Sequence, residues 1–280
     1  RTQVTVALSG DGGDELFAGY NRHAWAPRLW RLASRLPKQA RRAFATLQMV
    51  SVEDWDRAFR AVGLGNAVRI PGDKLHKVAA LAEVDTAHAF YERLRSHWLD
   101  PARVLAGSPA SREPRRTEYF DAPFAEQMMF YDLIEYLPSD ILTKVDRASM
   151  PLSLEARVPL LDHRLVEFAW RLPLSTKIRG RTQKWVLRQA LARHVPPSLF
   201  ERPKTGFGVP VGKWLRGPLK DWAASLLDEG ALKSEGIFDE SVVSSTWRAH
   251  QAGRGNHEHQ LWAVLMFQSW WGGHRNHVVS

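Results

Sequence analysis

Ser9-Gly10-Asp11-Gly12-Gly13-Asp14-Glu15 is the stretch of sequence that decides the fold of this chain. A short apolar run with β-branched residues, at positions 4–8, comes directly before it, and Leu16 and Phe17 follow it. An apolar run that ends in a glycine-rich turn and resumes at helical spacing predicts a strand, a tight turn and a helix start. Taken alone, the seven residues are explained more simply as a plain turn in which an Asp caps the helix.

The composition of this turn suits a phosphate ligand that is held through a metal ion. Its three glycines let the backbone turn tightly and approach a ligand closely, and the following helix offers free N–H groups. Its three carboxylates would repel phosphate unless a cation lay between them. Mg²⁺ binds hard carboxylate oxygens and bridges to phosphate oxygens. The turn therefore predicts a magnesium–nucleotide or magnesium–pyrophosphate site at the carboxyl end of a strand.

Three further segments carry charged side chains that could serve such a site. Asp140, Lys144 and Arg147 fall on one face of a predicted helix, a pattern that ordinary ion pairs along a helix also explain. Lys184 lies in a second predicted helix, and Lys204 lies in a Pro/Gly-rich segment that could close over a site. Lysines aimed at a phosphoryl or acyl-phosphate centre stabilise negative charge that grows during a reaction. Each of these lysines is equally explained as a surface residue.

Most of the remaining chain is predicted to be helical. Asp54, Thr86 and Asp162 each precede an amphipathic segment and are expected to cap a helix. Residues 101–118 are rich in Pro, Ser and Gly, which predicts an exposed, disordered loop between helical layers of one domain, 1–280. Further helices are expected at 123–137, 139–150, 162–172 and 182–194, and around 261–267, where the apolar run should be buried.

The composition indicates a globular protein without thiol chemistry. The chain has 280 residues, and 44% of them are hydrophobic, which is enough to bury a core. It has no cysteine, which excludes a disulfide scaffold, a thiolate zinc site and a cysteine nucleophile within these residues. No apolar run reaches the ~18 residues that a membrane helix needs, and no signal-peptide pattern is present, so we expect a cytoplasmic protein without membrane contact. Because the chain opens Arg-Thr-Gln-Val rather than with methionine, we expect a piece of a longer protein.

The net charge of +9 gathers mainly in one segment, 22–42. Apolar residues recur there at helical spacing, so its cations are expected on the outer face of an amphipathic helix. A solvated face is the simpler interpretation, and a helical module that binds nucleic acid or a partner protein is the alternative. No nucleic-acid-binding motif accompanies the segment, which favours the solvated face. The basic residues are Arg22, Arg28, Arg31, Arg35, Lys38, Arg41 and Arg42.

Taken together, the segments resemble a known family. The matching stretches are LSGDGGDELFAGY at 8–20, YLPSDILTKVDRASM at 136–150, SLEARVPLLDHRLVEFA at 153–169, the Lys184-Trp-Val-Leu-Arg188 pattern, and RPKTGFGVP at 202–210. Their order and content resemble the synthetase domain of glutamine-hydrolysing asparagine synthetases. The resemblance covers residues 4–25 and 123–270, and it is weak between them.

The resemblance implies a fold, an activity and a site. The fold would be α/β and predominantly helical, the C-terminal part of an adenine-nucleotide alpha-hydrolase-like (PP-loop) synthetase domain with few short parallel strands among helices. In that family ATP and aspartate give a β-aspartyl-adenylate and pyrophosphate, and ammonia from a separate N-terminal glutaminase domain then forms asparagine. Carried onto this chain, the catalytic residues would be Asp11, Lys184 and Lys204, the magnesium ligand Asp14, and the ATP-site residues Ser9, Gly10, Gly12, Gly13, Lys144 and Arg147. Asp11 stands where many members have Glu, and Asp140 and Asp146 would orient substrate and metal.

The chain also departs from the family pattern. It has no cysteine for a glutaminase and no Ser-Gly-Gly-x-Asp-Ser pyrophosphate loop. We therefore expect the C-terminal portion of a synthetase, inactive by itself, whose partners are ATP, Mg²⁺, aspartate or a related acid, ammonia and the glutaminase domain. The acid that is amidated is left open, because related proteins with this domain amidate sugars or close β-lactam rings. Whether the protein forms a homodimer is also left open. A catalytically silent scaffold is a third hypothesis, against which the retained acids and lysines argue.

Overall fold

A computed structural model describes residues 3–50, 52–61, 78–79, 81–82, 84–98, 100–107, 122–201 and 208–278. The chain divides into two compact units, each described here by itself. The first unit comprises Arg1–Arg35 and Thr117–Thr205, and the second comprises Leu36–Arg116 and Gly206–Ser280. Within the described ranges, none of the helices combines the length and the apolar character needed to span a membrane.

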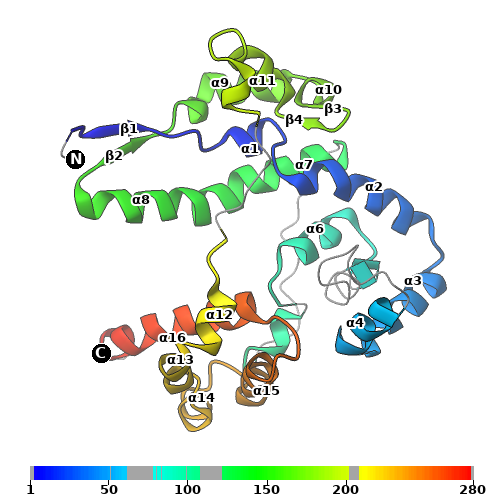
Figure 1. Ribbon diagram of the computed structural model, residues 1–280, viewed down its shortest axis with the longest axis vertical. Helices are drawn as coiled ribbons and strands as arrows, with labels where there is room; N and C mark the ends of the chain where they lie inside the picture. The colour runs from blue at the N-terminus through cyan, green and yellow to red at the C-terminus, as the bar shows by residue number, and fades with distance from the viewer. Residues whose placement is uncertain are drawn as a thin grey trace. The chain divides into compact units, whose positions relative to one another are not determined.

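The first unit contains a parallel strand pair, beside which α8 (Thr143–Ser149) runs, and several further helices (Figure 1). Strand β1 (Val6–Leu8) pairs in parallel with β2 (Glu155–Arg157), with Val6 opposite Glu155. Strands β3 (Ile178–Arg179) and β4 (Thr182–Gln183) form an antiparallel hairpin. The α-helices of this unit are α1 (Gly13–Leu16), α2 (Asn21–Arg35), α7 (Phe124–Tyr131), α8 (Thr143–Ser149), α9 (His163–Arg171), α10 (Leu174–Lys177) and α11 (Trp185–Leu191), and short 3₁₀ turns lie at Met150–Leu152, Pro159–Leu161 and Pro197–Leu199.

The strand before the glycine turn is confirmed, and its partner was not foreseen. Glu155 and Arg157 are both exposed and pair with each other, so the three residues of β2 lack the apolar pattern that marks a strand. The predicted combination of few short parallel strands with many helices agrees with the described part of the chain.

The predicted break at Pro138 is wrong, because one helical run passes through it. Helix α7 continues as a π-helical segment (Asp132–Leu142) and then as α8. Proline lacks an N–H and clashes with the preceding α-helical turn. The wider π turn accommodates that ring, and the Thr143 hydroxyl donates to the Pro138 carbonyl at 2.8 Å.

Helix caps were predicted with mixed success. Thr86 caps α6 (Ala87–Arg95) by accepting from the Ala89 N–H, and Asp162 caps α9 by accepting from the Arg164 N–H, as expected. Helix α4 (Val52–Ala61) begins before Asp54, which instead pairs with Arg57 inside the helix.

The helix predicted at 182–194 is wrong at its start. Thr182 and Gln183 form β4, Lys184 adopts a left-handed conformation with φ 53°, and α11 begins only at Trp185. Gly180, with φ 62°, turns the chain between β3 and β4. The hairpin therefore occupies the residues whose polarity fitted a helix start.

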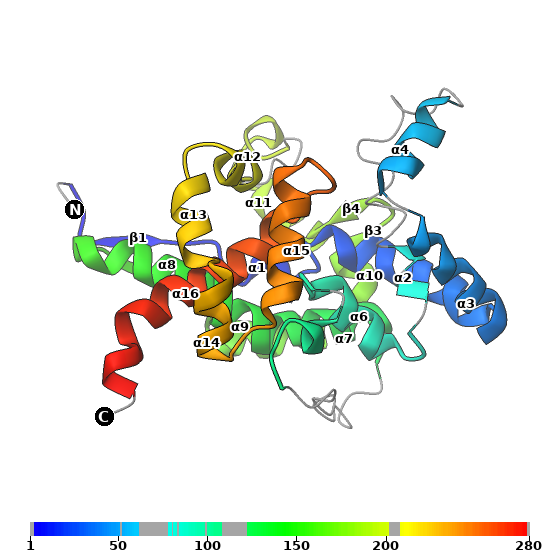
Figure 2. The same cartoon turned by 90° about the horizontal axis from the view of Figure 1, so that it is seen from below.

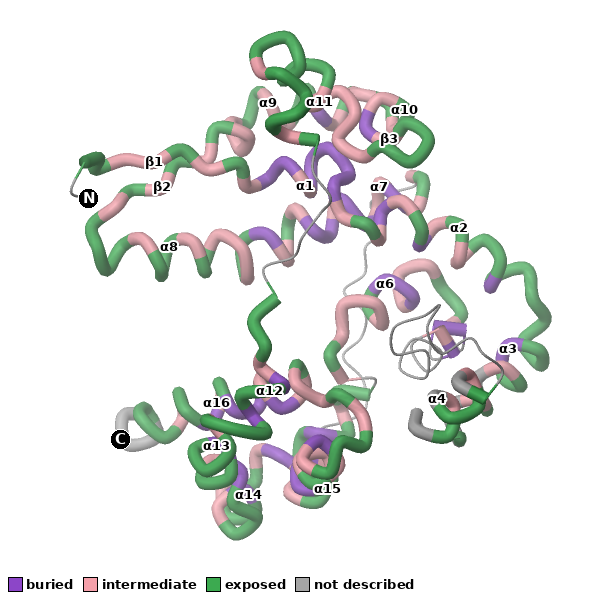
Figure 3. The backbone as a smooth tube through the Cα atoms, in the orientation of Figure 1, coloured by how far each residue is buried: buried purple, intermediate pink, exposed green. Residues whose placement is uncertain are grey.

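One apolar cluster of the first unit lies directly behind the glycine turn. Leu16 and Phe17 at the end of α1 pack with Ala169 of α9. The partly buried residues around them are Leu133, Val166, Trp170, Leu172, Val186 and Leu187. Figure 3 shows the buried stretch at α1, whereas β1, β2 and α8 carry no buried residue. The turn is thus anchored at its helical end.

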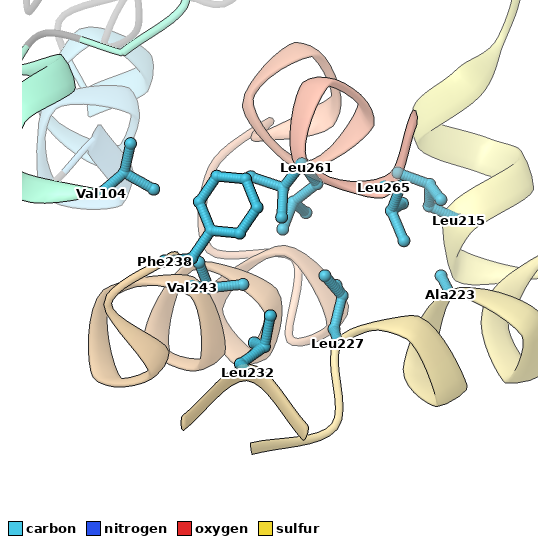
Figure 4. Packing of buried hydrophobic residues seen from close by; sticks show 10 residues of the cluster. Val104, Leu215, Ala223, Leu227, Leu232, Phe238, Val243, Leu261 and Leu265 are labelled. Atoms are coloured by element: carbon cyan, nitrogen blue, oxygen red, sulfur yellow. The ribbon is translucent and has the colours of Figure 1, made fainter. Parts of the chain in front are cut away.

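The second unit is helical in its described part and has an apolar cluster of its own. Figure 4 shows Phe238 beside Leu261 and Leu265 beside Leu215. Leu261 and Leu265 are fully buried, whereas Met266 is 39% exposed, so the apolar run at 261–267 buries one face rather than nearly every side. The elements of this unit are α3 (Lys38–Ala45), a 3₁₀ turn at Thr46–Met49, α4, α6, a 3₁₀ turn at Pro101–Arg103, α12 (Val211–Arg216), α13 (Lys220–Leu226), α14 (Glu229–Glu235), α15 (Glu240–Gln251) and α16 (Glu258–Val278), most of them labelled in Figures 1 and 2.

The predicted loop at 101–118 is only partly described. Its first residues form the 3₁₀ turn, and Leu105 makes an antiparallel bridge to Phe238. Val104 is buried in the apolar cluster of the second unit. Residues 108–118 of the predicted loop lie outside the described residues.

Candidate active site

The glycine turn is held between β2 and the 3₁₀ turn at Pro159–Leu161. The Ser9 N–H donates to the Arg157 carbonyl at 2.8 Å, and the Ser9 hydroxyl donates to the Asp11 carboxylate at 2.5 Å. Gly12 has φ 82°, and a Cβ built there would lie 2.5 Å from Leu161 Cδ2. Only glycine fits this position, for backbone and for packing reasons. A Cβ on Gly10 would meet nothing within 4 Å, so Gly10 is packed less tightly.

Two of the predicted site residues, 170 positions apart in the sequence, form an ion pair beside this turn. Lys184 Nζ lies 3.0 Å from Asp14 Oδ2, and the two side chains are 28% and 31% exposed. The Lys184 N–H donates to the Phe17 carbonyl at 3.2 Å, which ties the lysine backbone to the turn. A Cβ on Gly19 would lie 2.0 Å from Asp14 Oδ1 and 2.1 Å from Lys184 Cε. The pair therefore rests against the bare backbone of Gly19.

A pocket of about 450 Å³ opens beside this pair. Its charged residues are the cations of Arg181, Lys184 and Arg188 and the carboxylate of Glu201. An excess of positive charge in a pocket favours an anionic ligand. The lining is completed by Gly19, Asn21, Thr182 and Gln183.

Hydrogen bonds from the pocket wall fix its position against the chain that follows α1. The Gln183 side-chain amide donates to the carbonyls of Ala18 and Tyr20, at 3.2 and 2.6 Å. Arg188 Nε donates to the Gln183 carbonyl at 3.1 Å. The hairpin and α11 are in this way joined to the segment behind Asp14.

A buried polar layer lies behind Asp14. Glu15 is 1% exposed and accepts a hydrogen bond from the Tyr20 hydroxyl at 2.6 Å. Burial raises the pKa of Glu15, and the hydrogen bond from Tyr20 acts in the opposite direction. Burial and the neighbouring Glu15 raise the pKa of Tyr20 far above its ordinary value, so Tyr20 keeps its proton. Glu15 is thereby fixed by a neutral donor.

The other predicted site residues are placed differently. Lys144 pairs with Asp140 at 3.0 Å on an exposed helix face, and Asp146 and Arg147 are exposed on α8. Lys204 lies outside the described residues. Of the face expected toward the core, Ile141 and Val145 are partly buried and Ala148 is exposed.

Sequence reasoning missed several residues of the site. Arg181 and Gln183 stand three and one positions before Lys184, a proximity that could have marked them. In the sequence, Glu15 is one of three acidic residues in the turn, and nothing there distinguishes it from the other two. Asp132 lies in the predicted helix 123–137 with no local signal that distinguishes it, and its contacts depend on the tertiary fold.

Three cations of the basic segment 22–42 are engaged in ion pairs. Arg22 pairs with Asp132 in the first unit, whereas Lys38 and Arg41 pair with Asp85 in the second. The cations left exposed are Arg28, Arg31, Arg35 and Arg42, and they belong to two different units. The ion pairs of Arg22, Lys38 and Arg41 reduce the number of unpaired cations that this segment offers to nucleic acid.

Within the described ranges, no group of three or more His, Asp and Glu side chains is arranged to hold a metal ion. Asp14 offers a partly exposed carboxylate, and Asp11 lies three residues after the end of β1 in the same turn. Mg²⁺ is commonly bound by one or two carboxylates together with substrate phosphates. The donor set at the turn fits that mode of binding.

A parallel strand pair among many helices is compatible with the α/β class of proteins, and the cation-rich pocket near the glycine turn would suit an anionic ligand. The model of the asparagine synthase family matches residues 1–272, and the chain therefore belongs to this family. A putative glutamine-hydrolyzing asparagine synthetase of Mycobacterium tuberculosis is 32% identical over 96% of the chain and 39% of its own length. Glutamine-hydrolyzing asparagine synthetase 1 of Bacillus subtilis is 27% identical over 96% of the chain and 40% of its own length.

A more distant relative carries a different name. The protein named amidase chyE, of Penicillium rubens, is 22% identical over 84% of the chain and 37% of its own length. No solved structure gives a significant match. The chain spans about two fifths of the length of the curated relatives it matches.

Proposed function

We propose that this chain forms part of an ATP-dependent ligase that activates aspartate, or a related carboxylate, as an acyl-adenylate and then amidates it with ammonia. The observation that carries the proposal is the ion pair of Lys184 and Asp14 beside a cation-rich pocket at the glycine turn. Membership of the asparagine synthase family supports it. Relatives named glutamine-hydrolyzing support glutamine as the source of ammonia, through a separate glutaminase domain.

In this proposal Asp14 is the residue of this chain that would hold Mg²⁺. Its carboxylate is partly exposed, and its neighbour Lys184 provides a second positive charge for a polyphosphate. When bound, the ion would neutralise phosphate charge near the reacting centre. The backbone of Gly10, Gly12 and Gly13 and the Ser9 hydroxyl would lie along the nucleotide.

Lys184 would stabilise the negative charge that grows on the leaving pyrophosphate. A cation already held in place by Asp14 needs little rearrangement when that charge develops. Asp11 would act near the reacting carbonyl, by steering ammonia or taking a proton, with its carboxylate oriented by the Ser9 hydroxyl. Lys204 stays a candidate for a second phosphate contact.

The 280-residue chain is not expected to make asparagine by itself. The test uses the longer protein with ATP, ammonia and a panel of carboxylic acids, and mass spectrometry detects the acyl-adenylate and the amide. We expect AMP and pyrophosphate to form with aspartate or a related acid, and an Asp14→Asn variant to need more magnesium. The exposed Glu167, paired only loosely with Arg171, gives the control Glu167→Gln. Release of ADP instead of AMP, or no acid-dependent turnover, would contradict the proposal.

A further inference from the structure

A buried carboxylate in the first unit binds two side chains at once. Asp132 is fully buried, and its Oδ1 lies 2.7 Å from Arg22 Nη2. Its Oδ2 lies 3.2 Å from Arg22 Nε and 2.7 Å from His23 Nε2. Both oxygens are thus engaged by the start of α2, eight and nine residues after Asp14. This contact joins the π-helical segment to the chain that leaves the glycine turn.

Tyr20 connects this contact to the site. The Arg22 guanidinium lies 4.1 Å from the Tyr20 ring centroid, and the His23 and Tyr136 rings contact the same ring edge to face, at 5.5 and 5.8 Å. The Tyr20 hydroxyl donates to Glu15 at 2.6 Å. A continuous series of contacts therefore runs from Asp132 through Arg22 and Tyr20 to Glu15, the residue next to Asp14.

The energetics of this cluster favour a role in geometry over a role in stability. Burying a carboxylate costs free energy that pairing repays only with good geometry, and an apolar cluster of the same volume is often as stable. His23 adds a further cost, because its Nδ1 is buried without a hydrogen-bond partner among the described residues. Hydrogen bonds and ion pairs fix the direction of each side chain in the polar cluster, whereas apolar contacts would not.

We propose that Asp132 is a positioning residue that, through Arg22 and Tyr20, fixes Glu15 and so holds Asp14 against Lys184. The helix that carries Asp14 has only four residues, too few to set a side-chain position by its own hydrogen bonds. Asp132 reaches it from a long helical run that is packed against both α1 and α2. The effect on ligand binding rests on the proposed function, whereas the effect on the ion pair does not.

The test compares Asp132→Asn with the unchanged chain in two measurements. The first is calorimetric binding of magnesium pyrophosphate to the 280-residue chain, where we expect about tenfold weaker binding, the size found when residues that orient metal ligands are changed. The second is a crystal structure of each ligand-free chain, in which we expect Asp14 and Lys184 to separate beyond the ~4 Å of an ion pair. Glu167→Gln is the control and should change neither measurement.

Two milder variants test the same proposal if Asp132→Asn fails to fold. Tyr20→Phe removes only the hydroxyl that holds Glu15, and Arg22→Lys keeps the charge but removes the two-pronged contact with Asp132. Each should weaken binding by a smaller factor. Wild-type binding in all folded variants, or an unchanged Asp14–Lys184 distance, would overturn the proposal. The 280 residues contain no Ser-Gly-Gly-x-Asp-Ser loop, so if the unchanged chain binds no magnesium pyrophosphate, the binding measurement is repeated with a protein of the relatives' length. No binding there would mean that the proposed function of the site is wrong, and the crystal structures still decide the positioning role.

Discussion

At the scale of single residues, the site depends on where the backbone departs from regular structure. Lys184 adopts φ 53° between β4 and α11, which costs an ordinary residue about 1–2 kcal/mol. The strain is offset by the hydrogen bond from its N–H to the Phe17 carbonyl and by the ion pair with Asp14. A lysine in the middle of a regular helix would not have its backbone tied to the turn in this way.

Replacing Lys184 tests whether its charge acts during the reaction. In the longer protein, Lys184→Met should lower kcat for adenylate formation by about a hundredfold, because it removes a preorganised cation from developing charge. The apparent affinity for ATP should change much less. Steady-state and single-turnover kinetics measure both, with the exposed Lys233→Met as the control. An effect confined to ATP affinity would assign Lys184 to ground-state binding.

Gly19 offers a test of the ion pair that leaves its charges in place. A Cβ at Gly19 would lie within 2.1 Å of both partners, so Gly19→Ala must push Asp14 and Lys184 apart. We expect at least about tenfold weaker binding of magnesium pyrophosphate. The control is Gly272→Ala in α16, where a Cβ meets nothing within 4 Å and helix propensity favours alanine. Equal affinity of the Gly19→Ala variant and the unchanged chain would show that the pair does not contribute to binding.

At the scale of elements, short sequence patterns predicted the strand and the helix caps that depend on neighbouring residues. The strand before Ser9 and the caps at Thr86 and Asp162 followed from short patterns, and the structure confirms them. The π-helical passage through Pro138 and the hairpin before Lys184 did not follow from such patterns. The first packs against α1, and the second is bonded through Gln183 to the Ala18 and Tyr20 carbonyls, so both make contacts that are distant in the sequence. Only the family resemblance implied that Lys184 and Asp14 belong to one site. Hydrophobic periodicity and residue spacing in the sequence do not predict that the two residues are in contact.

In the second unit, a buried histidine side chain connects two helices. His250 of α15 is fully buried, and its Nδ1 accepts from the His257 N–H at 3.2 Å and faces Arg216 Nη2 at 3.3 Å. Its Nε2 lies 3.3 Å from the Gly212 carbonyl. Burial and the charge of Arg216 lower the pKa of His250 below its ordinary 6.5. The neutral ring thus joins α12 and α15.

The sign of the pH effect follows from that lowered pKa. As the pH falls below 6.5, unfolded chains bind a proton at His250 before folded ones do, so stability is lost between 6.5 and the folded pKa. The loss should approach about 1.4 kcal/mol per pH unit. Urea unfolding at a series of pH values measures it. His250→Asn keeps an acceptor for the His257 N–H and should flatten the slope, and an unchanged slope would exclude His250 as its source.

At the scale of the whole molecule, the parallel strand pair is less covered than such sheets usually are. Parallel sheets occur almost always with both faces packed. Here β1, β2 and α8 contain no buried residue, and the apolar side chains of Val4 and Leu8 are 53% and 75% exposed (Figure 3). The relatives are more than twice as long as the stretch they share with this chain. We therefore expect this surface to be covered in a protein of the relatives' length.

Hydrogen exchange along β1 tests that expectation. The Thr5 carbonyl and the Ser9 N–H bond to β2, so the alternation of a parallel strand directs the N–H groups of Val6 and Leu8 to the opposite edge. In the 280-residue chain these two amides should exchange rapidly. In a protein of the relatives' length they should exchange about a hundredfold more slowly, because a neighbouring strand would accept their hydrogen bonds. The Ser9 amide, already bonded to the Arg157 carbonyl, is the internal control and should be protected in both. Equal exchange of Val6 and Leu8 in the two proteins would mean that β1 is an edge strand and that its exposed apolar side chains are covered by something other than a strand.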